Sequence, residues 1–133
     1  MPEQSWKESK VKVRVWAPVY ATESVERVKK VVTNIFPDAR LRFEEDKLTG
    51  DASLDKLQEL LRKQKIRDSA RTVLLNCKKG NKIEFDLNKQ VAFVGKVNFG
   101  SSSLGSIHVS IETVNPDELI DWLASSSEVK HED

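Results

Sequence analysis

The chain has 133 residues, 38% of them apolar, and its 22 Lys and Arg against 21 Asp and Glu give a formal net charge of +1. The length suits one domain, and five Gly and four Pro exclude collagen-like and low-complexity classes. A near-neutral charge argues against a nucleic-acid binder only if the charges are spread evenly along the chain.

The first elements predicted along the chain are an arm and a strand. Residues 1–10 carry no periodic apolar pattern and are expected to form a flexible N-terminal arm. Val11, Val13 and Val15 alternate with polar residues, which is typical of a strand, and Pro18 ends it.

A helix follows, with Thr22 as its expected N-cap. Apolar residues at three-to-four spacing between Val25 and Ile35 predict an amphipathic helix that ends before Pro37.

The next stretch indicates two strands joined by a turn. Leu41 and Phe43 alternate with charged residues, and residues 45–47 read as a turn. Residues 48–52 predict a short strand, in which Gly50 weakens the strand or marks a bulge.

Two helical segments are expected in the middle of the chain. Ser53 is the N-cap candidate of the first, whose apolar stripe runs from Leu54 to Leu61. The second covers residues 69–76, with Asp68 or Ser69 as its cap.

The last part of the chain is predicted to form a turn, two strands and a helix. A turn at residues 79–81 leads into a strand at 83–87, and residues 90–99 fit either a short helix plus strand or one irregular strand. The alternation at residues 107–111 is the clearest strand pattern. Asn115 as N-cap, with Pro at the first helical position, predicts a final helix.

This order of elements predicts a single α+β domain over residues 11–124, with a mostly antiparallel sheet and helices packed on one face. Residues 125–133 are expected to form a flexible acidic tail. The polar sheet face could meet solvent or another subunit.

Catalytic chemistry is hard to find in the sequence. Cys77 is the only cysteine, so no internal disulfide can form, and the two histidines, His108 and His131, are not expected to share a metal. The chain has no apolar run of membrane-spanning length, and its polar N-terminus is unlike a signal peptide. We therefore expect a cytoplasmic protein that is not an enzyme and needs neither cofactor nor metal.

The charge is unevenly distributed along the chain. Residues 55–96 contain eleven basic and five acidic residues and carry +6, whereas the rest carries −5. Clustered cations are what phosphate binding requires, although a solvated helix face looks the same in sequence. Shape and backbone recognition of structured RNA fits this segment better than single-strand stacking.

Six stretches together resemble an archaeal family of uncharacterised proteins described as RNA-binding domains. They are APVYATE at 17–23, NIFPDA at 34–39, LRKQKIRDSARTVLL at 61–75, LNKQVAFVGKVNF at 87–99, LGSIHVSIE at 104–112 and PDELIDWLA at 116–124. The resemblance implies a fold similar to the ribosomal protein that binds five-S RNA, and it implies a homodimer. It brings no catalytic residues with it.

Charge and resemblance together predict a surface that binds structured RNA. The candidate residues are basic apart from one glutamine: Arg62, Lys63, Lys65, Arg67, Arg71, Lys78, Lys79, Lys89, Gln90 and Lys96. The alternative is a homodimeric interaction module without nucleic acid, in which the acidic part of one copy meets the basic part of another.

Overall fold

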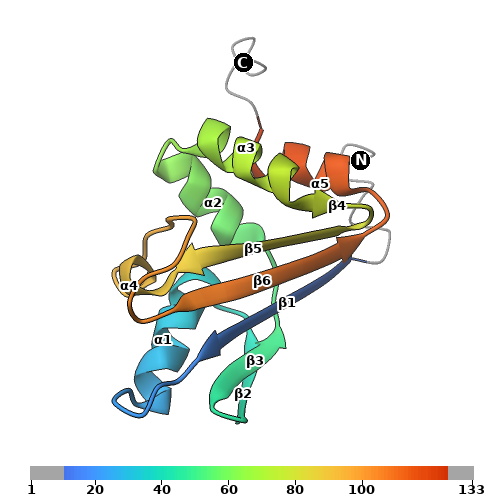
Figure 1. Cartoon of the computed structure of the whole chain (residues 1–133). Coiled ribbons are helices and arrows are strands. Elements are labelled where there is room, and N and C mark those ends of the chain that lie inside the picture. Colours follow the sequence, from blue (N-terminus) through green and yellow to red (C-terminus); the bar gives the residue numbers. More distant parts are fainter. Residues whose placement is uncertain (1–10, 126–133) are drawn as a thin grey trace.

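The structure, a computed structural model, describes residues 11–125 (Figure 1). The expected N-terminal arm at 1–10 and all but the first residue of the expected tail lie outside this range. The elements in chain order are β1 (Val11–Pro18), α1 (Val25–Ile35), β2 (Arg40–Glu44), β3 (Lys47–Asp51), α2 (Asp55–Lys63), α3 (Arg67–Cys77), β4 (Lys78–Lys79), β5 (Lys82–Asn88), α4 (Lys89–Ala92), β6 (Ser106–Thr113) and α5 (Pro116–Leu123).

The strands form one sheet in the order β2-β3-β1-β6-β5-β4, and every neighbouring pair is antiparallel. The helices cover one face of this sheet and leave the other open (Figure 1). The predicted α+β class, with an antiparallel sheet covered on one side, is therefore confirmed.

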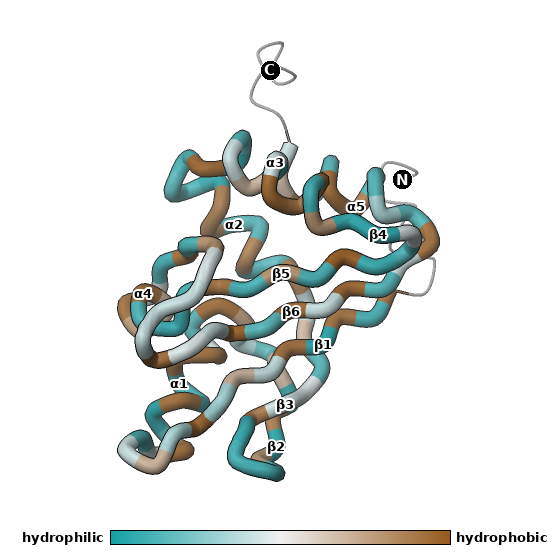
Figure 2. The backbone as a smooth tube through the Cα atoms, viewed as in Figure 1, coloured by the Kyte–Doolittle hydropathy of each residue, from teal (hydrophilic) through white to brown (hydrophobic). Residues whose placement is uncertain are grey.

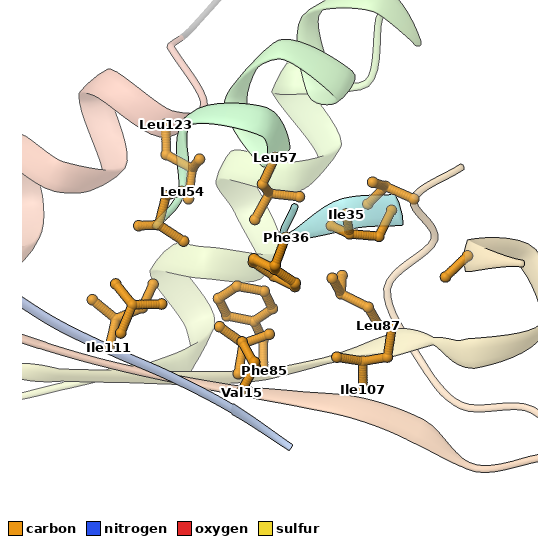
Figure 3. Close-up of a cluster of buried hydrophobic side chains, with 14 of the residues drawn as sticks. Val15, Ile35, Phe36, Leu54, Leu57, Phe85, Leu87, Ile107, Ile111 and Leu123 are labelled. Carbon is orange, nitrogen blue, oxygen red and sulfur yellow. The ribbon is translucent and has the colours of Figure 1, made fainter. Parts of the chain in front are cut away.

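The core lies between the sheet and the helices, as the alternation of the strands requires. Figure 3 shows Val15, Phe85 and Ile111 of the sheet pointing toward Phe36 and the helical Leu57. In Figure 2 brown and teal alternate along β5 and β6, so each strand gives one face to the core and the other to the open side. Every buried residue of α1 belongs to the predicted stripe: Val28, Val31, Val32 and Ile35.

Helix starts differ from the sequence prediction at three places. The N-cap of α1 is Ser24 and not Thr22, because the Ser24 hydroxyl accepts the Arg27 N–H at 3.1 Å. Helix α2 has Leu54 at its N-cap position, with no side-chain cap bond, and α3 likewise begins after Ile66. Buried apolar contacts thus set where α2 and α3 begin, whereas side-chain capping predicted that they begin at neighbouring residues.

The β2–β3 hairpin turns on Glu45 and Asp46, which both have positive φ, at 53° and 63°. Gly50 makes no bulge, since the pairing of β3 with both neighbours is regular. A Cβ atom at Gly50 would lie 2.0 Å from the Arg40 carbonyl oxygen, so close backbone approach is what requires the glycine.

The uncertain segment after β5 resolves into a short helix without a following strand. Asn88 caps α4, its side-chain oxygen accepting the N–H groups of Gln90 and Val91. Between α4 and β6 the chain makes two isolated bridges, Leu87 with Phe99 and Ser102 with Gly105. The last helix has Asn115 at its N-cap and Pro116 at its first position, as predicted.

Candidate nucleic-acid interface

Cations gather where α2 ends. Arg62 and Lys63 occupy its last turn, where positive charge complements the helix dipole. Lys63 bridges Glu59 at 3.2 Å, whereas Arg62 and Lys65 are exposed and bridge no carboxylate among residues 11–125. The hydrogen bond from Lys63, with the nearby Lys56, holds the pKa of Glu59 below its ordinary value.

A Schellman-type C-cap sets the direction of the chain at this point. The Lys65 N–H donates to Arg62 O and the Ile66 N–H to Leu61 O, both at 3.1 Å. Lys65 occupies the left-handed position with φ of 59°, where glycine is the usual residue. The cap turns Lys65 outward and lets α3 start two residues later.

Gln64 attaches a distant loop to this helix end. Its side-chain amide accepts the Val97 N–H at 2.8 Å and donates to the Val97 carbonyl at 3.0 Å. Lys96, exposed and next in the chain to Val97, is thereby held beside the cations that flank Gln64. Residues more than thirty positions apart thus share one surface.

The same surface continues onto α4 and α1. Asn34 of α1 donates to the carbonyls of Ala92 and Phe93, which fixes α4 against α1. The Arg27 guanidinium lies 5.1 Å from the centre of the Phe93 ring. Phe93 is 48% exposed, so its ring belongs to the surface and not to the core.

We call this surface the cationic edge. It joins five cations to an aromatic ring and an exposed amide: Arg27, Arg62, Lys63, Lys65, Gln90, Phe93 and Lys96. Of the residues proposed from the sequence, the structure brings together five of these, namely Arg62, Lys63, Lys65, Gln90 and Lys96. The candidates proposed from the sequence include neither Arg27, a residue on the polar face of α1, nor Phe93.

The remaining candidates lie elsewhere. Arg71 bridges Asp121 at 2.6 Å and Lys78 bridges Asp117 at 2.6 Å, so both face α5. Arg67 donates to the Ser125 hydroxyl at 3.2 Å on the same side. Lys79 is exposed at the β4–β5 hairpin, at the far end of α3 from the cationic edge (Figure 1).

Lys89 is placed differently again, because it is only 2% exposed. Its ammonium donates to the Pro18 carbonyl at 2.6 Å and to Glu23 Oε1 at 2.8 Å, and it lies 4.9 Å from the centre of the Tyr20 ring. A buried, paired ammonium cannot meet a phosphate backbone, so Lys89 is removed from the predicted binding surface.

The open sheet face carries a second polar arrangement. The rings of Trp16 and His108 stack at 4.0 Å between centroids, and His108 Nδ1 lies 2.7 Å from Asp86. The Lys47 ammonium lies 4.9 Å from the centre of the Trp16 ring. These four residues run across β5, β6, β1 and β3.

Cys77 borders a cavity of about 590 Å³ that also reaches Asp86 and His108. Burial, with the Asp86 carboxylate nearby, raises the pKa of the Cys77 thiol above its ordinary value. A thiol that stays protonated is a weak nucleophile, so this grouping does not favour thiol chemistry. Within residues 11–125, no cluster of three or more His, Cys, Asp or Glu side chains could hold a metal ion. No helix in that range could cross a membrane.

Comparison with known proteins identifies a family for this chain. A family model described as RNA binding matches residues 12–113. A UPF0201 protein of Methanothermobacter thermautotrophicus is 44% identical over 119 residues, covering 85% of this chain and 90% of the relative. One from Pyrococcus horikoshii is 43% identical over 123 residues, covering 84% of this chain and 88% of the relative.

Solved structures of UPF0201 proteins have the same fold as this chain. The crystal structure of an uncharacterised UPF0201 protein superposes with a TM-score of 0.82 at 34% identity, covering 88% of this chain and 95% of the other. The UPF0201 protein of Methanococcus jannaschii gives a TM-score of 0.78 at 37% identity, with 87% and 94% covered. The expected likeness to the ribosomal five-S-RNA-binding protein stays a prediction.

Proposed function

The chain belongs to the archaeal UPF0201 family and matches a family model described as RNA binding, and from this premise we propose that it binds structured RNA along the cationic edge. The proposed role is binding without catalysis, in the cytoplasm. The observation that carries the proposal is the double hydrogen bond between Gln64 and Val97, which brings Lys96 beside Lys63 and Lys65.

The requirements of phosphate binding favour the cationic edge over the other basic surfaces of the protein. Cations release counterions from RNA only if they reach the phosphates, and Arg62, Lys65 and Lys96 are exposed and bridge no carboxylate among residues 11–125. Arg71 and Lys78 already have carboxylate partners on α5. The cationic edge is therefore the part of the basic segment best suited to a polyanion.

The first test replaces the three exposed cations of the cationic edge together. We expect Arg62→Gln, Lys65→Gln and Lys96→Gln to weaken binding of a structured RNA about tenfold or more at low salt. The slope of log affinity against log salt should become shallower by about 2 to 3, since each phosphate contact contributes about 0.7 to 0.9. Fluorescence anisotropy at several salt concentrations measures both quantities.

The matched control removes three exposed, unbridged cations from other surfaces, by Lys12→Gln, Arg40→Gln and Lys79→Gln. Both triple variants lower the net charge equally, so the control isolates position from total charge. Equal losses in the two variants would mean that the interaction is non-specific. No binding by the unaltered protein at low salt would overturn the proposal.

A second candidate function, self-association, rests on the charge pattern of the open sheet face. On β1, β3 and β2 this face carries five basic residues and two acidic ones: Lys12, Arg14, Arg40, Arg42, Lys47, Glu44 and Asp51. On β6 and β5 it carries one basic residue and three acidic ones: Lys82, Glu84, Asp86 and Glu112. A two-fold axis parallel to the strands, between β1 and β6, would place the basic half of one copy on the acidic half of the other.

For this homodimer we expect a mass that falls toward the monomer as salt rises, because charge pairs at the interface are screened. Light scattering at low and high salt measures the mass. Arg14→Glu, at the centre of the face, should favour the monomer at low salt, whereas Lys29→Glu, at an exposed position of α1 on the helix-covered side of the sheet, should not. A strict monomer at high protein concentration in low salt argues decisively against self-association. This surface is distinct from the cationic edge, so the two functions are compatible.

A further inference from the structure

A cavity of about 440 Å³ opens within the cationic edge, between α1 and α4. Its apolar wall consists of Val28 and Val31 of α1, and Leu104 of the loop before β6 closes another side. The size is in the range of pockets that hold small organic groups. Nothing in the first proposal, which concerns phosphates, uses this cavity.

The deep end of the cavity is polar, because the side chains of Lys89 and Glu23 there are only 2% and 15% exposed. Lys89 and Glu23 line it and form the buried ion pair described above. Glu23 uses the same oxygen, Oε1, to accept from the Tyr20 N–H at 2.9 Å and from Lys89. Its other carboxylate oxygen takes part in no hydrogen bond among residues 11–125 and can accept one from a ligand.

The rim carries the groups that contact unpaired bases in RNA complexes. Bases that leave a helix stack on aromatic rings or on the plane of an arginine side chain. Phe93 and Arg27 supply both at one side of the opening. The exposed Gln90 amide, which offers a donor and an acceptor, lies on the same rim and makes no side-chain hydrogen bond within residues 11–125.

We propose that this cavity binds one unpaired nucleobase of the bound RNA. The proposal rests on the proposed function and narrows it to structured RNA with a loop or bulge. A phosphate is the less suitable occupant, because the Glu23 carboxylate lines the deep end. A neutral base with an apolar ring face and N–H donors at its edge matches Val28, Val31 and Glu23. Arg27 at the rim is then placed to meet the phosphate that follows the base.

The test compares a hairpin RNA that has an unpaired loop with a fully paired RNA duplex of equal length. We expect Phe93→Ala to weaken hairpin binding about five- to a hundredfold, the range for loss of one base-stacking contact. Duplex binding and its salt slope should be unchanged, because the phosphate contacts remain. Gln90→Ala should weaken hairpin binding in the same direction and leave duplex binding unchanged.

Phe43→Ala is the matched control, since Phe43 on β2 is exposed to the same extent as Phe93, at 48%, but lies outside the cationic edge. It should leave hairpin binding unchanged. If the unaltered protein binds neither RNA at low salt, the proposed function fails and the base site fails with it. If it binds both RNAs and Phe93→Ala behaves like Phe43→Ala, the base site alone is overturned.

Discussion

Individual residues acquire their roles here from what surrounds them, and Lys89 is the clearest case. In sequence it is one of eleven cations in a basic segment. In the structure it is buried at the start of α4, and its ammonium binds the carbonyl at the end of β1 and the carboxylate of Glu23 ahead of α1. Its charge stabilises the wall of a cavity and is not offered to a ligand.

Removing this ammonium should therefore cost stability. We expect Lys89→Ala to lower the free energy of unfolding by about 3–5 kcal/mol, because it leaves the Glu23 carboxylate and the Pro18 carbonyl without their buried partner. Urea denaturation measures the change. Lys79→Ala, at an exposed cation, should change stability by no more than about 0.5 kcal/mol. Equal effects of the two substitutions would contradict the structural role of Lys89.

At the scale of elements, the junction of α2 and α3 is the important feature. A Schellman-type cap stops α2 at Lys63, and the next helix begins at Arg67. The residue in the left-handed position is a lysine and not a glycine. The element boundary thus holds a strained residue whose charge belongs to the proposed binding surface, a combination often found at functional sites.

Because Lys65 is strained, its replacement by glycine is expected to raise stability while it weakens RNA binding. Lys65→Gly should raise the free energy of unfolding by about 0.5–1 kcal/mol, because glycine adopts the positive φ without steric cost. Lys63→Gly, within the last turn of α2, removes the same charge but should lower it by about 0.5–1 kcal/mol. Both variants should weaken RNA binding. Denaturation and anisotropy on the same samples test the pair, and a loss of stability in Lys65→Gly would show that the position is not strained.

At the scale of the whole molecule, the fold divides the basic segment among several settings. Part of it forms the cationic edge, part is neutralised by Asp117 and Asp121 of α5, and Lys89 is buried with Glu23. Lys79 and Lys82 lie at the β4–β5 hairpin. The near-zero net charge therefore reflects ion pairs within the chain. It also reflects two exposed surfaces of opposite sign, the cationic edge and the acidic half of the open sheet face. A polyanion is expected to approach from the side of the cationic edge and to be repelled by the acidic half of the open sheet face.

Much of the fold was predictable because its patterns are local. Alternation in β1, β5 and β6 and the three-to-four spacing in α1 directly express which side of an element is buried. Helix starts were less predictable: α2 and α3 begin without side-chain caps, since packing of Leu57, Leu61 and Ala70 outweighs a capping bond. For the segment after β5 the sequence left open a short helix plus strand or one irregular strand, because a single turn has no period to read. The structure has the short helix α4 without the strand.

Periodicity and composition alone predict an α+β domain with one covered sheet face and a polarised charge distribution, because these patterns are local. The family follows from the resemblance of six stretches of sequence to known relatives. Which cations share a surface depends on contacts between distant parts of the chain. The bonds from Gln64 to Val97 and the contact of Arg27 with Phe93 join residues 33 and 66 positions apart. Such neighbours are set by how the helices pack on the sheet, and no local pattern encodes them.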